Sequence, residues 1–156
     1  MEQTNKSELF NKVAEIELVY KTTVKPSERR KITTSKDVYD LFLESWDPNK
    51  IEFVEEFKVM LLNRSNKVLG ICSFTTGGVS GTVADPKLVF IAALKANASN
   101  VMIAHNHPSG NLKPSKADED LTLKIKEAGK FLDLPLLDHF IITKEVYFSF
   151  ADEGII

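Results

Sequence analysis

The sequence predicts an α/β fold in which a mixed β-sheet is sandwiched by helices. Segments with the hydrophobic spacing of strands and of helices interleave along the chain, which is the pattern of α/β folds. Residues 101–104 form a continuous apolar run, as expected for a central strand that is covered on both faces. A chain of 156 residues that is 43% hydrophobic and 27% charged is long enough for one domain with a substantial core.

The first half of the chain contains signals for two helices and three strands. Thr34 and Asp37 fit a capping box, so we expect a helix to begin there, with Val38, Leu41 and Phe42 on its apolar face. The other expected elements are a short helix over 9–16, a strand over 17–24, a loop over 25–31 and an antiparallel hairpin of 55–62 with 68–75. We therefore divide the chain into an N-terminal extension, 1–33, and a domain, 34–156.

The second half contains two stronger helix signals. Asp85 can cap a helix whose first position is Pro86, and Ser115 starts another. Apolar faces are predicted for both helices, at Val89, Phe90, Ala93 and Leu94 in the first and at Leu121, Ile125, Ala128 and Leu132 in the second. A last pair of strands is expected at 140–142 and 146–150.

Composition argues against several classes of protein. The net charge of −2 gives no general attraction to nucleic acid, and we interpret the one basic cluster, Lys25, Arg29, Arg30 and Lys31, as a solvated loop. The only cysteine, Cys72, excludes an internal disulfide and fits a small buried hydrophobe. No apolar stretch reaches the ~18 residues of a membrane span, and we expect a cytoplasmic protein.

The strongest chemical signal follows the apolar run. His105 and His107 are two of only three histidines, and Asp118 comes 11 positions after the second. If the strand continues through His107, its period of two places both rings on one face, and Pro108 with Gly110 turns the chain back toward Asp118. Two imidazoles and a carboxylate suit Zn²⁺ and leave one position for water. This pattern predicts a hydrolytic zinc site.

Hydrolysis also requires a base, and Glu55 and Glu56 are the best candidates. They begin a mostly apolar strand, and because alternation sends them to opposite faces, at most one can face the metal. Ser115 and Asp118 also fit a capping box, which accounts for both residues without a metal. We interpret His139 as a structural or supporting histidine.

These residues resemble the JAMM motif of JAB/MPN metalloproteases, in which an early Glu precedes His-x-His, then Pro, Ser and Asp. The longer string from His105 to Gly110, followed by Ser115, Asp118 and Asp138-His139, is similar to the RadC branch of that superfamily. The resemblance implies a cytidine-deaminase-like α/β sandwich with one zinc. It also implies that His105, His107 and Asp118 are the ligands, that Glu55, by alignment on Phe57, is the general acid/base, and that Ser115 is the oxyanion donor.

Three functions follow as hypotheses. The first is a zinc-dependent hydrolase of peptide or isopeptide bonds, with a protein or peptide substrate. The second is an accessory protein in DNA repair or recombination, which rests on the resemblance to RadC and on the basic cluster from Lys25 to Lys31. The chain resembles a short form without the N-terminal helical hairpin module, and the lack of that module weakens this hypothesis. The third is a metal-free scaffold. Metal content separates the first from the third.

Overall fold

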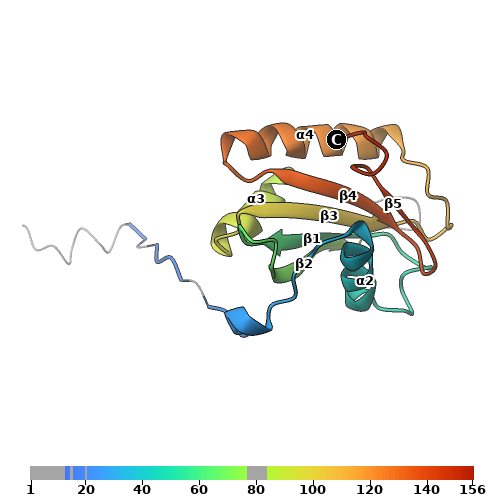
Figure 1. Cartoon of the computed structure of the whole chain (residues 1–156). Helices are drawn as coiled ribbons and strands as arrows, with labels where there is room; N and C mark the ends of the chain where they lie inside the picture. The colour runs from blue at the N-terminus through green and yellow to red at the C-terminus, as the bar shows by residue number, and fades with distance from the viewer. Residues whose placement is uncertain (1–12, 15, 20, 77–83) are drawn as a thin grey trace, which may run out of the picture.

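A five-stranded mixed sheet forms the centre of the structure (Figure 1). This computed structural model describes residues 13–14, 16–19, 21–76 and 84–156. The strand order is β2-β1-β3-β4-β5, with β3 and β4 parallel and the other neighbours antiparallel. The strands are β1 (Glu56–Leu62), β2 (Val68–Thr76), β3 (Asn100–Asn106), β4 (Leu136–Ile142) and β5 (Tyr147–Ser149).

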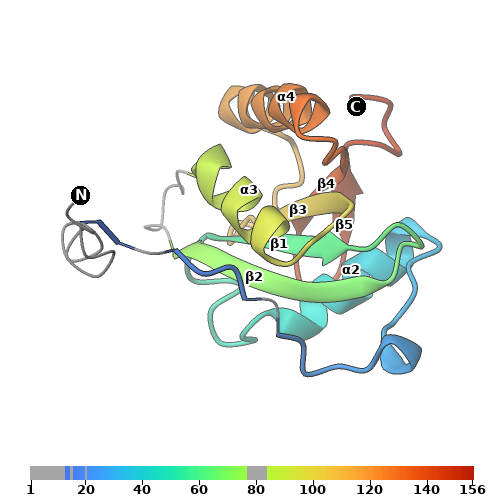
Figure 2. The ribbon, with the colours of Figure 1, turned by 90° about the vertical axis from the view of Figure 1, so that its left-hand side faces the viewer.

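Helices cover both faces of this sheet, which confirms the predicted fold class. As Figure 2 shows, α3 (Pro86–Lys95) and α4 (Lys116–Phe131) lie over one face, and α2 (Ser35–Ser45) lies over the other. A 3₁₀ helix, η1 (Pro26–Glu28), precedes them. Each face has its own buried apolar cluster. Within the described ranges, no helix is both long and apolar enough to cross a membrane.

The central strand, β3, contributes side chains to both clusters by simple alternation. Val101 and Ile103 belong to the cluster beneath α3 and α4, whereas Ala104 packs in the cluster beneath α2. Because side chains alternate along a strand, His105 faces the side of α3 and α4. Asn106 faces the opposite side. The strand therefore delivers its last two buried polar side chains to different layers.

Local sequence accounts for where the helices begin. The Thr34 hydroxyl accepts the Asp37 N–H at 3.2 Å, and the Asp37 carboxylate accepts the Thr34 N–H at 2.9 Å, so the predicted capping box is confirmed. Hydrogen bonds from the hydroxyl and N–H of Thr33 and from the N–H of Thr34 lower the pKa of Asp37 to about 2. Asp85 likewise accepts the Lys87 N–H at 2.9 Å, with Pro86 at the first helical position.

Some predictions differ from the structure. The strand predicted over 17–24 is wrong, because residues 17–19 and 21–24 form no regular element. An isolated backbone bridge forms later, between Lys31 and Lys67, one residue before β2. A strand needs a ladder partner, which hydrophobic spacing cannot supply. Most of the helix predicted over 9–16 and the turn at Gly77, Gly78 and Gly81 lie outside the described residues.

Two leucines assigned to apolar helix faces are exposed. Leu94 is 59% exposed in the last turn of α3, and Leu132, which caps α4, is 44% exposed. Helical spacing identifies a face but not how far the partner surface extends along it. The other predicted face residues of these helices lie in or against the core.

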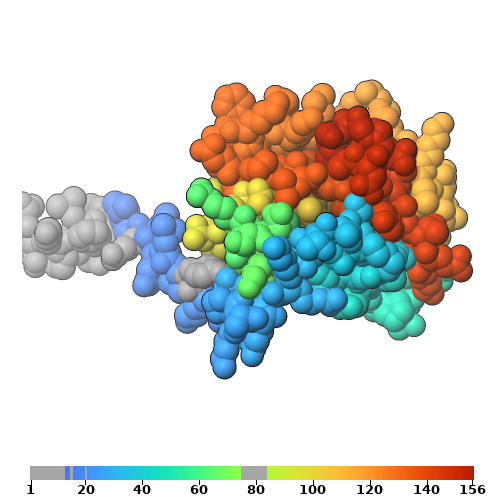
Figure 3. Space-filling view, in the orientation of Figure 1, coloured from blue at the N-terminus to red at the C-terminus, as the bar shows by residue number. Residues whose placement is uncertain are grey.

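The C-terminal segment packs back onto the domain. Figure 3 shows this segment (red) against α4 (orange). The Ser35 hydroxyl donates to Asp152 at 2.9 Å, which ties the segment to the start of α2. Packing is also close near the end of α4, where the backbone of Leu134 leaves no room for a side chain at Gly129. A Cβ there would lie 2.3 Å from the Leu134 carbonyl oxygen.

We predict that Gly129→Ala lowers the free energy of unfolding by about 1–3 kcal/mol, the usual cost of overpacking a close contact. The backbone has to move because the opposing atom is a carbonyl oxygen and not a flexible side chain. Gly70→Ala is the matched control, since a Cβ at Gly70 meets nothing within 4 Å. Chemical denaturation of both variants measures the difference, and equal stabilities would contradict the prediction.

Candidate metal site

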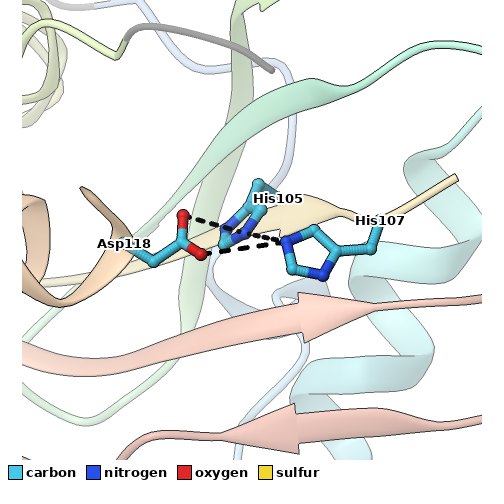
Figure 4. Close-up of side chains that lie close together, drawn as sticks. All are labelled: His105, His107 and Asp118. Atoms are coloured by element: carbon cyan, nitrogen blue, oxygen red, sulfur yellow. Dashed lines mark hydrogen bonds and ion pairs between the residues drawn. The ribbon is translucent and has the colours of Figure 1, made fainter. Parts of the chain in front are cut away.

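The structure brings His105, His107 and Asp118 together where β3 ends and α4 begins (Figure 4). The two Nε2 atoms lie 2.9 Å apart. Asp118 Oδ1 lies 3.3 Å from Nε2 of His105, and Oδ2 lies 3.8 Å from Nε2 of His107. Within the described part of the chain, this is the one group of three or more His, Cys, Asp or Glu side chains arranged closely enough to hold a metal ion.

His107 is held by the loop that follows it. Its N–H donates to the Ile142 carbonyl at 3.2 Å, which extends the contact between β3 and β4 by one residue. Its ring Nδ1 bonds to the Asn111 carbonyl, and the loop turns at Gly110, whose φ of 80° is in the left-handed region that glycine adopts freely. The His107 side chain is 17% exposed, whereas that of His105 is 3% exposed. The Asp118 side chain is 15% exposed, so solvent reaches the site beside His107 and Asp118.

Asp118 combines a capping role with a place in the site. The N–H and the hydroxyl of Ser115 each donate to Asp118 Oδ2 at 2.7 Å, and the Ser115 hydroxyl accepts the Asp118 N–H at 3.1 Å. This is the predicted capping box. Because Oδ2 serves the cap, Oδ1 is left to approach His105. The cap and the metal site are thus compatible uses of one carboxylate.

Asp118 is held as an anion. Burial disfavours its ionised form, but hydrogen bonds from the hydroxyl and N–H of Ser115 and the proximity of His105 outweigh that cost and keep the pKa of Asp118 well below its usual range. Its position in the first turn of α4 adds the favourable field of a helix N-terminus.

The ring proton of His107 lies on the side away from the metal site. A carbonyl oxygen only accepts, so the bond between His107 Nδ1 and the Asn111 carbonyl places a proton on Nδ1. In a neutral imidazole the other nitrogen, Nε2, then presents a lone pair. That lone pair faces His105 Nε2 and an ionised carboxylate. Neighbouring acceptors of this kind are stabilised by a shared cation, so the group could hold a metal ion.

Strand register distinguishes the two candidate bases. Phe57 in β1 lies directly opposite His105 in β3, so both point to the same face. Glu55 is two residues before Phe57 and shares that face if the alternation continues one residue beyond the strand. Glu56 points to the α2 side and is buried there. The geometry favours Glu55, whose catalytic role remains a prediction.

Two polar residues near the site were not anticipated. The fully buried Asn106 amide donates to the carbonyls of Ile51 and Val54 at 2.7 and 2.8 Å and accepts the Glu56 N–H at 2.7 Å. Asn106 therefore clamps the segment that carries Glu55. Strand alternation between the two histidines accounts for its facing away from them, but the sequence does not show what it binds.

The second unanticipated residue is Thr122, one turn after Asp118 on α4. Its hydroxyl lies 2.6 Å from Nδ1 of His139, and His139 Nε2 lies 2.8 Å from Nδ1 of His105. His139 is fully buried and stacks on Phe150 with 4.5 Å between ring centroids. Burial lowers the pKa of His139 well below its ordinary value. His139 thus contacts one member of the site from behind.

Comparison with known proteins identifies the family. The model of the RadC-like JAB domain matches residues 32–155. The chain belongs to the RadC-like JAB domain family. The resemblance drawn from the histidine motif is therefore confirmed.

Individual RadC-like relatives are longer than this chain. A UPF0758 protein of Flavobacterium johnsoniae is 47% identical over 127 residues, which are 81% of this chain and 54% of that protein. A UPF0758 protein of Clostridium botulinum is 37% identical over 134 residues, 86% of this chain and 58% of that protein. The chain spans a little over half the length of these curated relatives.

The two capping boxes allow a matched test of the RadC-like site. We predict that Ser115→Ala and Thr34→Ala each lower stability by about 0.5–2 kcal/mol, because each removes a helix cap. Only Ser115→Ala should also weaken zinc binding, by about 10–100-fold, because only Ser115 orients a carboxylate of the site. Thermal denaturation and competitive zinc titration measure the two effects. Equal zinc affinities in the two variants would contradict this role.

Proposed function

We propose that this chain is a zinc-dependent hydrolase that cleaves amide bonds in a peptide or isopeptide substrate. The observation that carries the proposal is the convergence of two imidazole nitrogens and an aspartate carboxylate at a place that solvent reaches. Membership of the RadC-like JAB domain family supports it, because the residues shared with the JAMM motif of JAB/MPN metalloproteases are those that converge.

The donor set fits zinc. Imidazole and carboxylate suit Zn²⁺, whereas Cu(I) and iron–sulfur clusters prefer sulfur ligands. Donors at ~2.0–2.2 Å from one tetrahedral ion lie roughly 3.3–3.5 Å from one another. The two Nε2 atoms are 2.9 Å apart, and His105 Nε2 is 3.3 Å from Asp118 Oδ1, which is close to that spacing. A bound zinc ion would act as a Lewis acid and lower the pKa of a water molecule toward ~7.

Glu55 supplies the proton transfers in this proposal. It is partly buried and lies one residue before β1, two residues from Phe57, which pairs with His105. From there its carboxylate takes a proton from the attacking water and passes it to the leaving nitrogen. A positioned base of this kind contributes about 10²–10⁴-fold to the rate.

Ser115 supplies a hydrogen bond to the oxygen of the scissile carbonyl. Its hydroxyl points to Asp118 in the structure, so it must turn toward substrate. Asp118 Oδ2 keeps the Ser115 N–H when it does. One donor to a developing oxyanion is worth about 2.7–4 kcal/mol.

The second candidate function is association with nucleic acid in repair or recombination. It rests on the basic cluster of Lys25, Arg29, Arg30 and Lys31, in which Arg30 pairs with Glu44 at 2.8 Å. The Arg30 carbonyl bonds to Val68 at the start of β2, which strand register places at the opposite end of the sheet from His105. Salt-dependent DNA binding that is lost on replacing these four residues with alanine would support this function, and absence of binding at low salt would exclude it.

We predict that protein purified without added metal contains close to one zinc ion per chain. His105→Ala, His107→Ala and Asp118→Ala should each reduce this content strongly, since each removes one of three ligands. Plasma emission spectrometry gives the metal content. Well below one ion per chain in the unmodified protein would count against the proposal.

We further predict that Glu55→Gln leaves zinc bound but lowers hydrolysis by at least about 100-fold, because the amide cannot take a proton. Glu56→Gln is the matched control, since Glu56 lies on the other face of the sheet. Both variants are assayed on a fluorogenic peptide library and a set of lysine-linked isopeptides. Hydrolysis that survives Glu55→Gln would reject Glu55 as the base.

A further inference from the structure

A continuous line of hydrogen bonds leads from the backbone of α4 to the far side of the His105 ring. The Asp118 carbonyl and the Thr122 hydroxyl lie 2.6 Å apart, and the hydroxyl is 2.6 Å from His139 Nδ1. His139 Nε2 is 2.8 Å from His105 Nδ1. Thr122, His139 and His105 are 1%, 0% and 2% exposed, so water does not compete for these bonds.

Counting protons along this line fixes its direction. The Asp118 carbonyl has no proton, so the single hydroxyl proton of Thr122 lies between the two oxygens. The bond between Thr122 and His139 must then use a proton on His139 Nδ1.

The same count continues to the metal site. His139 is fully buried, and neither of its hydrogen-bond partners is a carboxylate, so it is neutral and its Nε2 accepts. The proton in the last bond therefore comes from His105 Nδ1. A neutral His105 with its proton on Nδ1 has its lone pair on Nε2, the atom that faces His107 and Asp118.

The opposite direction is unfavourable at the α4 end of the line. If Thr122 donated to His139, two oxygens would face each other at 2.6 Å without a proton. The only proton of a neutral His105 would then lie on Nε2, where His107 and Asp118 would accept it in the absence of metal but where it would block a ligand atom.

We infer that Thr122 and His139 are positioning residues that hold His105 in the Nδ1–H tautomer, so that Nε2 is free to bind the metal. This inference deepens the proposed function and rests on it for the identity of the metal. The line begins at the backbone carbonyl of Asp118 and ends at the ring of His105. It therefore joins two of the three proposed ligands. It also links the position of α4 to the place of the proton on the His105 ring in β3.

The test reads the tautomer directly in the full chain without metal. Protein labelled with ¹⁵N in its histidines is examined by long-range ¹H–¹⁵N correlation at about pH 8, above the ordinary histidine pKa of ~6.5. We expect His105 and His139 both to carry their proton on Nδ1. Because zinc takes no part in this measurement, its result is independent of whether the hydrolase proposal holds.

Variants of Thr122 test the cause. Thr122→Val keeps the shape but removes the hydroxyl, so we expect mixed tautomers at His105 and zinc affinity lower by about 10–100-fold. Thr122→Ser keeps the hydroxyl and should restore both. Denaturation curves will check that both variants are folded. Thr122 is replaced rather than His139, because removing the fully buried His139 ring can prevent folding. An unprotonated Nδ1 on His105 in the unmodified chain, or an unchanged proton position and zinc affinity in Thr122→Val, would overturn the inference.

Discussion

Two imidazole nitrogens and a carboxylate are held 2.9 to 3.8 Å apart at the junction of β3 and α4, and the other polar contacts of the site serve this arrangement. Such groups repel unless a cation or an added proton lies between them. The fold keeps them together because hydrogen bonds on the side away from the site orient His107 and Asp118. The loop carbonyl of Asn111 fixes His107, and the capping box of α4 fixes Asp118. The cost of this convergence is the physical reason to expect a metal.

The central strand builds the site from both of its faces. His105 points toward α4, while the neighbouring Asn106 points the other way and clamps the segment before β1. One strand end thus positions a proposed ligand on one side and the backbone that carries Glu55 on the other. A helix start performs a similar double task, since Ser115 and Asp118 cap α4 and contribute to the site.

Sequence predicted those parts of the molecule whose causes are local. The capping residues Thr34, Asp85 and Ser115 marked helix starts, and the apolar run before His105 marked the central strand. The spacing of His105, His107 and Asp118 was enough to group them. The choice between Glu55 and Glu56 required the pairing of β1 with β3, which the sequence does not encode in any short pattern. Resemblance to a family favoured Glu55, and register gives a structural reason for it.

Other parts depended on tertiary partners. The contact between His139 and His105 follows from the parallel register of β3 and β4, in which His139 lies beside Ile103. Thr122 reaches His139 only because α4 packs against β4. The strand predicted over 17–24 also depended on a tertiary partner. Its residues suit a strand, but without a neighbouring strand to pair with they form none.

The most direct test of the metal site is a crystal structure with anomalous diffraction recorded on both sides of the zinc absorption edge. The account predicts one zinc peak at ~2.0–2.2 Å from Nε2 of His105, Nε2 of His107 and a carboxylate oxygen of Asp118. Absence of any peak among these three side chains, even after crystals are soaked in zinc, would contradict it.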